Sequence, residues 1–331
     1  MADIRKIAEL AGVSTATVSR VVNSHPHVNS KTRDRVLKVI QDQNYYPNAL
    51  AANLRRKTSD IIGYLQFGSP KLVDSRMAQI AESILFEAGF KTFMCNADED
   101  PDREQFFLDE MIGRRVAGAI LCPQGRDERA LKAAIRLQQA GIATLLQSTS
   151  STNPGVSSVA VNQAQGWQVG ITHLMALGHK QITFLGHAPT NAERQQSILQ
   201  PMTEMHIQHL WLRTDKPFKE SIGLAIDQLL NTPSTALICA SEQIAATAIQ
   251  QLHKRQINVP KQISIMCFGG SDFSRMILPR ITVISLPVED LGLLCAQQML
   301  NLISRPDAPA RNILIENQLV IGDTTAHPQC Q

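Results

Sequence analysis

The sequence lacks the long apolar segments of a membrane protein and the leader of a secreted one. Its longest apolar runs, such as residues 117–122, fall far short of the roughly 20 residues that a membrane-spanning helix needs. Near the N-terminus, Asp3 and Glu9 alternate with basic residues, and no apolar core of a signal peptide is present. We therefore expect a cytoplasmic protein without a membrane partner.

The signatures of several enzyme and metal-binding classes are also missing. No Walker loop, GxSxG, HExxH or GxGxxG after a strand occurs, and no two of the six cysteines form a Cys-x-x-Cys pair. The cysteines lie mostly in apolar runs, which is typical of small buried side chains. His173, His179 and His187 show no metal-ligand grouping. We predict that the chain is not an enzyme and holds no cofactor or metal.

Positive charge is confined to one end of the chain. Residues 1–60 hold ten Lys and Arg against five Asp and Glu, a net charge of +5, whereas the remaining residues hold 22 against 24, a net charge of −2. A local basic excess indicates that the N-terminal segment meets a polyanion.

The first 45 residues predict a unit of three short helices. Gly12 follows the first helix, where a left-handed C-cap is favoured, and Ser14 and Ser30 are predicted to cap the second and third helices. The second helix, over residues 15–23, presents small and polar side chains opposite three valines. Such a face suits the major groove of DNA, although a polar stripe is also typical of a solvated helix. The apolar residues at helical spacing are Ile4, Ile7, Ala8, Val18, Val21, Val22, Val36, Val39 and Ile40.

After a short segment at residues 48–58, the pattern of apolar residues changes. From residue 61, apolar strand candidates alternate with amphipathic helices, which predicts a parallel, doubly wound sheet divided between two lobes. Ligands of such folds bind beyond the carboxyl ends of the strands. The candidate strands cover residues 61–67, 90–95, 117–122, 142–146, 182–185, 236–239 and 263–268.

The run of residues 4–54 closely resembles the signature of the lactose and galactose repressor (LacI/GalR) family of bacterial transcriptional regulators. The resemblance implies an all-α helix-turn-helix domain at residues 1–46, a hinge helix or linker at 47–59, and an α/β two-lobed periplasmic-binding-protein-like domain for ligand binding and dimerisation at 60–331. It places base contacts at Thr15, Ala16 and Arg20, and phosphate contacts at Ser14, Thr17, Ser19 and Asn23.

The segment 48–56 looks like the family's hinge helix, which implies DNA contacts from Asn48, Ala51, Leu54 and Arg55. Leu54 occupies the position of a leucine that wedges into the minor groove and kinks the duplex. Without the resemblance, Leu54 reads as an ordinary apolar linker residue.

The effector residues implied by the resemblance depart from the usual pattern. Arg194 matches a ligand-clamping arginine, and Phe218 matches an aromatic platform, although a core phenylalanine is the alternative. The family's usual carboxylates are missing at Asn162 and Gly269, while Glu242 replaces the Asp of an Asn-Asp pair.

A retained arginine and lost carboxylates favour an acidic effector, such as the sugar acid gluconate or a sugar phosphate. The Phe-Gly-Gly loop at residues 268–270 also resembles that of gluconate-type repressors, whereas Glu242 argues against an acid. The alternatives are a repressor that responds to a neutral sugar and a sugar-binding protein without a regulatory role.

The resemblance further implies control of carbohydrate-metabolism genes at the nucleoid by a homodimer on pseudo-palindromic operator DNA. The tail after Ile321 lacks the leucine heptads of a tetramerising helix. The effector of such a regulator either releases DNA or promotes its binding.

Overall fold

The computed structural model describes residues 3–22, 25, 27–43, 45, 59–68, 72–148, 155–188, 203, 207–213 and 215–329. The chain divides into two compact units, Met1–Ser59 and Asp60–Gln331. No helix within these described ranges is both long and apolar enough to cross a membrane.

The first unit contains the three expected helices, α1 (Ile4–Ala11), α2 (Thr15–Val22) and α3 (Ser30–Asp42). They enclose a small core that includes Ile7, Val18 and Val36. Gly12 ends α1 in the left-handed conformation, with φ 61°, as predicted. The predicted cap of α3 is wrong by one residue, because the Asn29 side chain accepts the Lys31 N–H and Ser30 is already helical.

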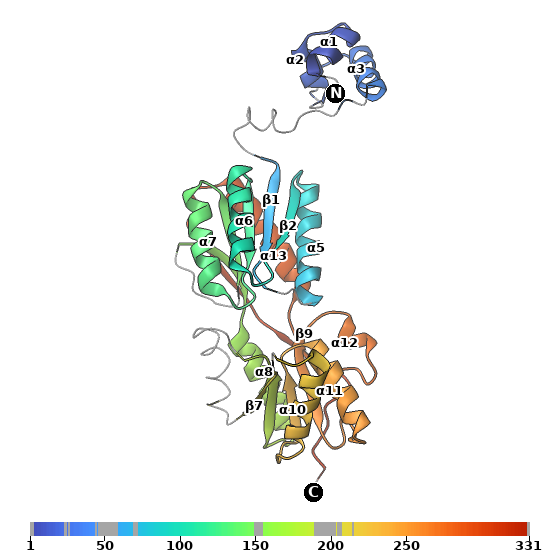
Figure 1. Ribbon diagram of the computed structural model, residues 1–331, viewed down its shortest axis with the longest axis vertical. Helices are drawn as coiled ribbons and strands as arrows, with labels where there is room; N and C mark the ends of the chain where they lie inside the picture. The colour runs from blue at the N-terminus through green and yellow to red at the C-terminus, as the bar shows by residue number, and fades with distance from the viewer. Residues whose placement is uncertain are drawn as a thin grey trace. The chain divides into compact units, whose positions relative to one another are not determined.

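The second unit has two lobes, each built on one sheet of six strands (Figure 1). The sheet of the first lobe has the order β11-β5-β4-β3-β1-β2, and all of its strands are parallel. Its elements are β1 (Ile61–Gln66), α5 (Leu72–Glu87), β2 (Lys91–Asn96), α6 (Pro101–Gly113), β3 (Gly118–Cys122), α7 (Asp127–Gln139), β4 (Ala143–Ser148), β5 (Ser157–Val161), α13 (Val288–Ser304) and β11 (Asn312–Ile315).

The sheet of the second lobe has the order β12-β10-β9-β8-β6-β7, with β12 antiparallel to β10 and the other neighbours parallel. Its elements are α8 (Gln163–Ala176), β6 (Ile182–Gly186), β7 (Gln208–Trp211), α10 (Phe218–Leu229), β8 (Ala236–Cys239), α11 (Glu242–Lys254), β9 (Ser264–Gly269), α12 (Phe273–Met276), β10 (Thr282–Ser285) and β12 (Gln318–Val320).

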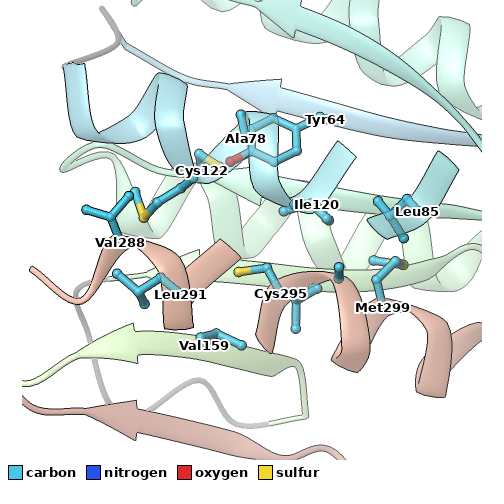
Figure 2. Packing of buried hydrophobic residues seen from close by; sticks show 14 of the residues in the cluster. Tyr64, Ala78, Leu85, Ile120, Cys122, Val159, Val288, Leu291, Cys295 and Met299 are labelled. Atoms are coloured by element: carbon cyan, nitrogen blue, oxygen red, sulfur yellow. The ribbon is translucent and has the colours of Figure 1, made fainter. Parts of the chain in front are cut away.

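Helices cover both faces of each sheet, which confirms the predicted doubly wound architecture. In the first lobe, Ile62 and Tyr64 of β1 face the layer formed by α5 and α13, while Leu65 faces the layer formed by α6 and α7. Figure 2 shows the side chains of Leu85 of α5 and Met299 of α13 close together within the first of these layers. The chain passes between the lobes after β5, after β10 and after β11, so both lobes border the same crossing segments.

Candidate functional site

Helix α2 presents a continuous exposed face opposite its buried valines. Val18 and Val21 are buried in the core of the first unit, whereas Thr15, Ala16 and Arg20 are exposed. Ala16 and Arg20 are four residues apart and therefore lie on one line along the helix. The small Ala16 allows a close approach to a groove, and Arg20 supplies the donors for a guanine edge.

The N-terminus of α2 carries a hydroxyl pair. The Ser14 hydroxyl caps the helix by accepting the Thr17 N–H at 3.2 Å, as predicted, and lies 3.0 Å from the Thr17 hydroxyl. A helix N-terminus with free N–H groups and hydroxyls is suited to a phosphate. Ser19 is half-buried. The other predicted DNA contacts, Asn23, Asn48, Ala51, Leu54 and Arg55, lie outside the described residues.

A cavity of about 180 Å³ opens between the two lobes of the second unit. It lies at the carboxyl ends of strands, as expected for this fold, with Cys122 ending β3 and Val161 ending β5. Its lining comprises Val73, Asp74, Met77, Cys122, Gln124, Gly125, Gln147, Val161, Gln163, Trp167, Phe184, Ala240, Phe268, Leu286, Leu291 and Asn317.

The polar side chains on the first lobe are held in fixed positions. Gln147 Oε1 accepts hydrogen bonds from the Tyr64 hydroxyl at 2.7 Å and from the Cys122 thiol at 3.2 Å. Burial raises the pKa of the Cys122 thiol and that of the Tyr64 hydroxyl, so both groups stay protonated and act as donors. Gln124 donates to Asp74 Oδ2 at 2.9 Å and accepts the Gly68 N–H at 2.8 Å. The first lobe therefore offers a preorganised amide and one carboxylate.

The second lobe contributes an aromatic wall. The Trp167 ring lies 5.1 Å from Phe184 and 4.9 Å from Phe268, measured between ring centroids, in tilted and edge-on arrangements. Such packing fixes the three rings against one another. Among the described residues that line the cavity, Asp74 alone has a carboxyl group, and none has a basic side chain. The described wall is thus apolar and aromatic on one side, and amide-rich and acidic on the other.

The residues that the sequence singled out for the effector take different places. Asn162 caps α8 by accepting the Gln165 N–H at 3.1 Å, between two cavity-lining neighbours. Phe218 begins α10 and is 44% exposed, outside the cavity lining. Arg194 lies outside the described residues.

Glu242 is buried beneath the loop that follows β9 and does not belong to the cavity lining. Its Oε1 accepts the N–H groups of Gly270 at 3.2 Å and Ser271 at 3.1 Å, and its Oε2 accepts the Ser271 hydroxyl at 2.5 Å. A Cβ atom at Gly269 would lie 2.5 Å from Glu242 Cδ. The Glu242 side chain therefore fills the space that a side chain at position 269 would need, and its carboxylate holds the loop.

The sequence did not predict several of the residues that line the cavity. Gln147 lies at the end of β4, and Gln124 directly follows β3, so the rule that ligands bind at the carboxyl ends of strands was the available signal. Trp167 and Asn317 gave no such signal, because one lies within a helix and the other in a crossing segment between lobes.

Comparison with known proteins agrees with this arrangement. Residues 3–48 match the family of bacterial regulatory proteins, lacI family, and residues 171–325 match a periplasmic binding protein-like domain. The chain is 28% identical to the HTH-type transcriptional repressor PurR of Mannheimia succiniciproducens, over 97% of this chain and 98% of the relative. The chain thus carries a LacI-family helix-turn-helix domain, and it is similar over nearly its whole length to a LacI-type regulator. It is accordingly a DNA-binding transcriptional repressor and not an enzyme, as the sequence predicted.

The fold of the lac repressor extends over nearly the whole chain. The lac repressor dimer bound to operator and the anti-inducer ONPF matches with a TM-score of 0.80 and 24% identity, over 98% of this chain and 99% of that one. A LacI-family regulator from Enterococcus faecium with bound ribose matches with a TM-score of 0.67 and 21% identity, over 81% of this chain and all of that one. These likenesses confirm the predicted architecture of a helix-turn-helix domain and a two-lobed domain.

Proposed function

We propose that this regulator binds pseudo-palindromic operator DNA as a homodimer through the exposed face of α2. The observation that supports the proposal is the line of Ala16 and Arg20 opposite the buried Val18, within the basic end of the chain. A two-fold protein matches a two-fold site, so each helix reads one half-site. Base contacts are assigned to Thr15, Ala16 and Arg20, phosphate contacts to Ser14, Thr17, Ser19 and Asn23, and hinge contacts to Asn48, Ala51, Leu54 and Arg55.

The effector is proposed to bind in the cavity between the lobes. Closure of the lobes around a ligand changes their relative position, and a ligand that binds the DNA-bound and free forms unequally shifts the balance between them. Glu242 and Gly269 are assigned to the shape of the loop at residues 269–271, and Asn162 to the position of its cavity-lining neighbours. Arg194 and Phe218 stay proposed effector contacts.

The described cavity lining favours a neutral sugar over an acid. Asp74 would repel a carboxylate or phosphate, whereas its oxygens accept hydrogen bonds from sugar hydroxyls. The aromatic wall suits the apolar face of a sugar ring. The second candidate is an acidic effector, either a sugar acid such as gluconate or a sugar phosphate. This candidate requires Arg194 to supply the opposite charge. Either class implies control of carbohydrate-metabolism genes.

Calorimetric titration separates the two effector classes. Ribose, galactose and glucose represent neutral sugars, and gluconate and glucose 6-phosphate represent acids. Because Asp74 lines the cavity, Asp74→Asn should weaken the binding of a neutral sugar and strengthen the binding of an acid. Binding of the acids alone, unaffected by Asp74→Asn, would reject the neutral assignment.

A gel-shift assay then tests the regulatory role. The full chain is mixed with the duplex upstream of its own gene, with and without the sugar that binds. A change in DNA affinity in either direction supports the proposal, and a bound sugar that leaves DNA affinity unchanged contradicts it.

A further inference from the structure

Two buried polar atoms in the cavity wall have no hydrogen-bond partner among the described residues. They are the indole nitrogen Nε1 of Trp167, a residue that is 1% exposed, and the amide oxygen Oδ1 of Asn317, a residue that is 5% exposed. Both residues line the cavity. In the described part of the chain, the other two such atoms, on Thr92 and Arg136, belong to side chains outside this lining.

The Asn317 amide is fixed in the orientation that leaves its oxygen unpaired. Its Nδ2 donates to the Asn162 carbonyl at 2.8 Å, and a flipped amide would set two acceptors against each other. The backbone N–H of Asn317 is bonded to Gln165 Oε1 at 2.8 Å, which anchors the residue. Gly166 makes room for the amide, because a Cβ there would lie 2.7 Å from Asn317 Nδ2.

The indole of Trp167 is equally constrained, because Phe184 and Phe268 pack against its ring. An indole N–H is a donor only, and an amide oxygen is an acceptor only. Each buried group left unpaired carries an uncompensated desolvation penalty. A ligand that satisfies both groups removes this penalty, so the wall is complementary to a ligand face that both accepts and donates hydrogen bonds.

A hydroxyl group has that capacity, since its oxygen accepts and its hydrogen donates. A carboxylate or a fully ionised phosphate only accepts, and would face the unpaired Asn317 oxygen with a second acceptor. We propose that Trp167 Nε1–H donates to, and Asn317 Oδ1 accepts from, hydroxyl groups of the effector, and that the two atoms so select an uncharged, hydroxylated face at the cavity wall. This inference rests on the proposed function of the cavity as the effector site.

The test uses the indole N–H signals of the full-length protein. The chain has two tryptophans, Trp167 and Trp211, so ¹⁵N-labelled protein gives two indole signals, and Trp211→Phe assigns them. Ribose, galactose, glucose, gluconate and glucose 6-phosphate are titrated in turn. We expect a neutral sugar to move the Trp167 indole proton downfield, as a new hydrogen bond does, while the Trp211 signal, from outside the cavity lining, stays in place.

Affinity measurements complete the test. Trp167→Phe keeps a packing ring but removes the donor, and should weaken the binding of that neutral sugar about tenfold to a hundredfold. Trp211→Phe is the matched control and should bind as the wild type does. A singly deoxygenated analogue that binds the wild type more weakly should show no further loss in Trp167→Phe, because both changes remove the same hydrogen bond.

The inference is overturned if no neutral sugar moves the Trp167 signal at millimolar concentrations, or if Trp167→Phe binds the sugar as tightly as the wild type. The proposed function fails separately. An acid that binds, alters DNA affinity and leaves the Trp167 signal unmoved would refute the hydroxyl site and preserve the proposed regulatory role. A bound neutral sugar without effect on DNA affinity would refute the regulatory role and preserve the hydroxyl site.

Discussion

Replacing Gly269 by alanine should destabilise the second unit through one identifiable contact. The new Cβ would lie 2.5 Å from Glu242 Cδ and 2.8 Å from Oε1. Glu242 is 2% exposed, so its side chain is enclosed by protein atoms. Moving the carboxylate aside would break its bonds to Gly270 and Ser271. Overpacking and the partial loss of hydrogen bonds to a charged group together lower the free energy of unfolding by about 3 kcal/mol.

For a unit of this size, such a loss lowers the melting temperature by about 6–12 °C. Differential scanning calorimetry of the full chain measures it. Gly223→Ala is the matched control, because Gly223 lies within α10 and its Cβ would meet Gln251 Oε1 at an ordinary 3.6 Å. Since alanine is the better helix former, this control should gain about 0.5–1 kcal/mol.

The double variant Gly269→Ala with Glu242→Ala isolates the contact. Once the glutamate is shortened, the methyl group has space, so the combined loss should be smaller than the sum of the two single losses. Additive losses, or a Gly269→Ala melting temperature within about 2 °C of the wild type, would refute the idea that Glu242 occupies the place of a side chain at 269.

Three further predictions concern other parts of the chain. Ser14→Ala removes the cap of α2 at a cost of about 1 kcal/mol, so amide hydrogen exchange at Thr17 should quicken about fivefold; unchanged exchange would deny the cap. Burial lowers the pKa of His179, so its neutral form stabilises the fold above the unfolded pKa of about 6.5, and this contribution is lost as pH falls. Urea midpoints should therefore drop on acidification, and less steeply in His179→Gln. Leu54→Ala should weaken specific DNA binding far more than non-specific binding at fixed salt, and equal losses would contradict a wedge role.

Among the strands that the structure describes, the sequence predicted β1, β2, β3, β4, β6, β8 and β9, and missed β5, β7, β10, β11 and β12. β1, β3, β8 and β9 are continuous apolar runs and were found within one or two residues. β7 is largely exposed, and β5 begins with Ser157 and Ser158, whose polarity hides two fully buried positions. β11 and β12 span only four and three residues. These strands are defined by their pairing with neighbouring strands, which the hydrophobic periodicity of a segment does not reveal.

The binding cavity was predictable in place but not in composition. The carboxyl-end rule locates it, yet its lining depends on which side chains the two lobes bring face to face. Glu242 shows the difficulty, because its position in the sequence suggests a ligand contact while its carboxylate bonds the loop at 270–271. Trp167 shows the reverse, because a tryptophan within a helix reads as core until its unpaired nitrogen is seen beside the cavity.

The most direct test of the central claim is selection of binding sites by the full chain from a library of random DNA duplexes. If α2 reads the operator, a pseudo-palindrome is enriched, and Arg20→Ala relaxes the base preference at one symmetric position in each half-site while the other positions keep theirs. No enriched site, or an identical preference profile for Arg20→Ala, would contradict the claim that α2 reads the operator.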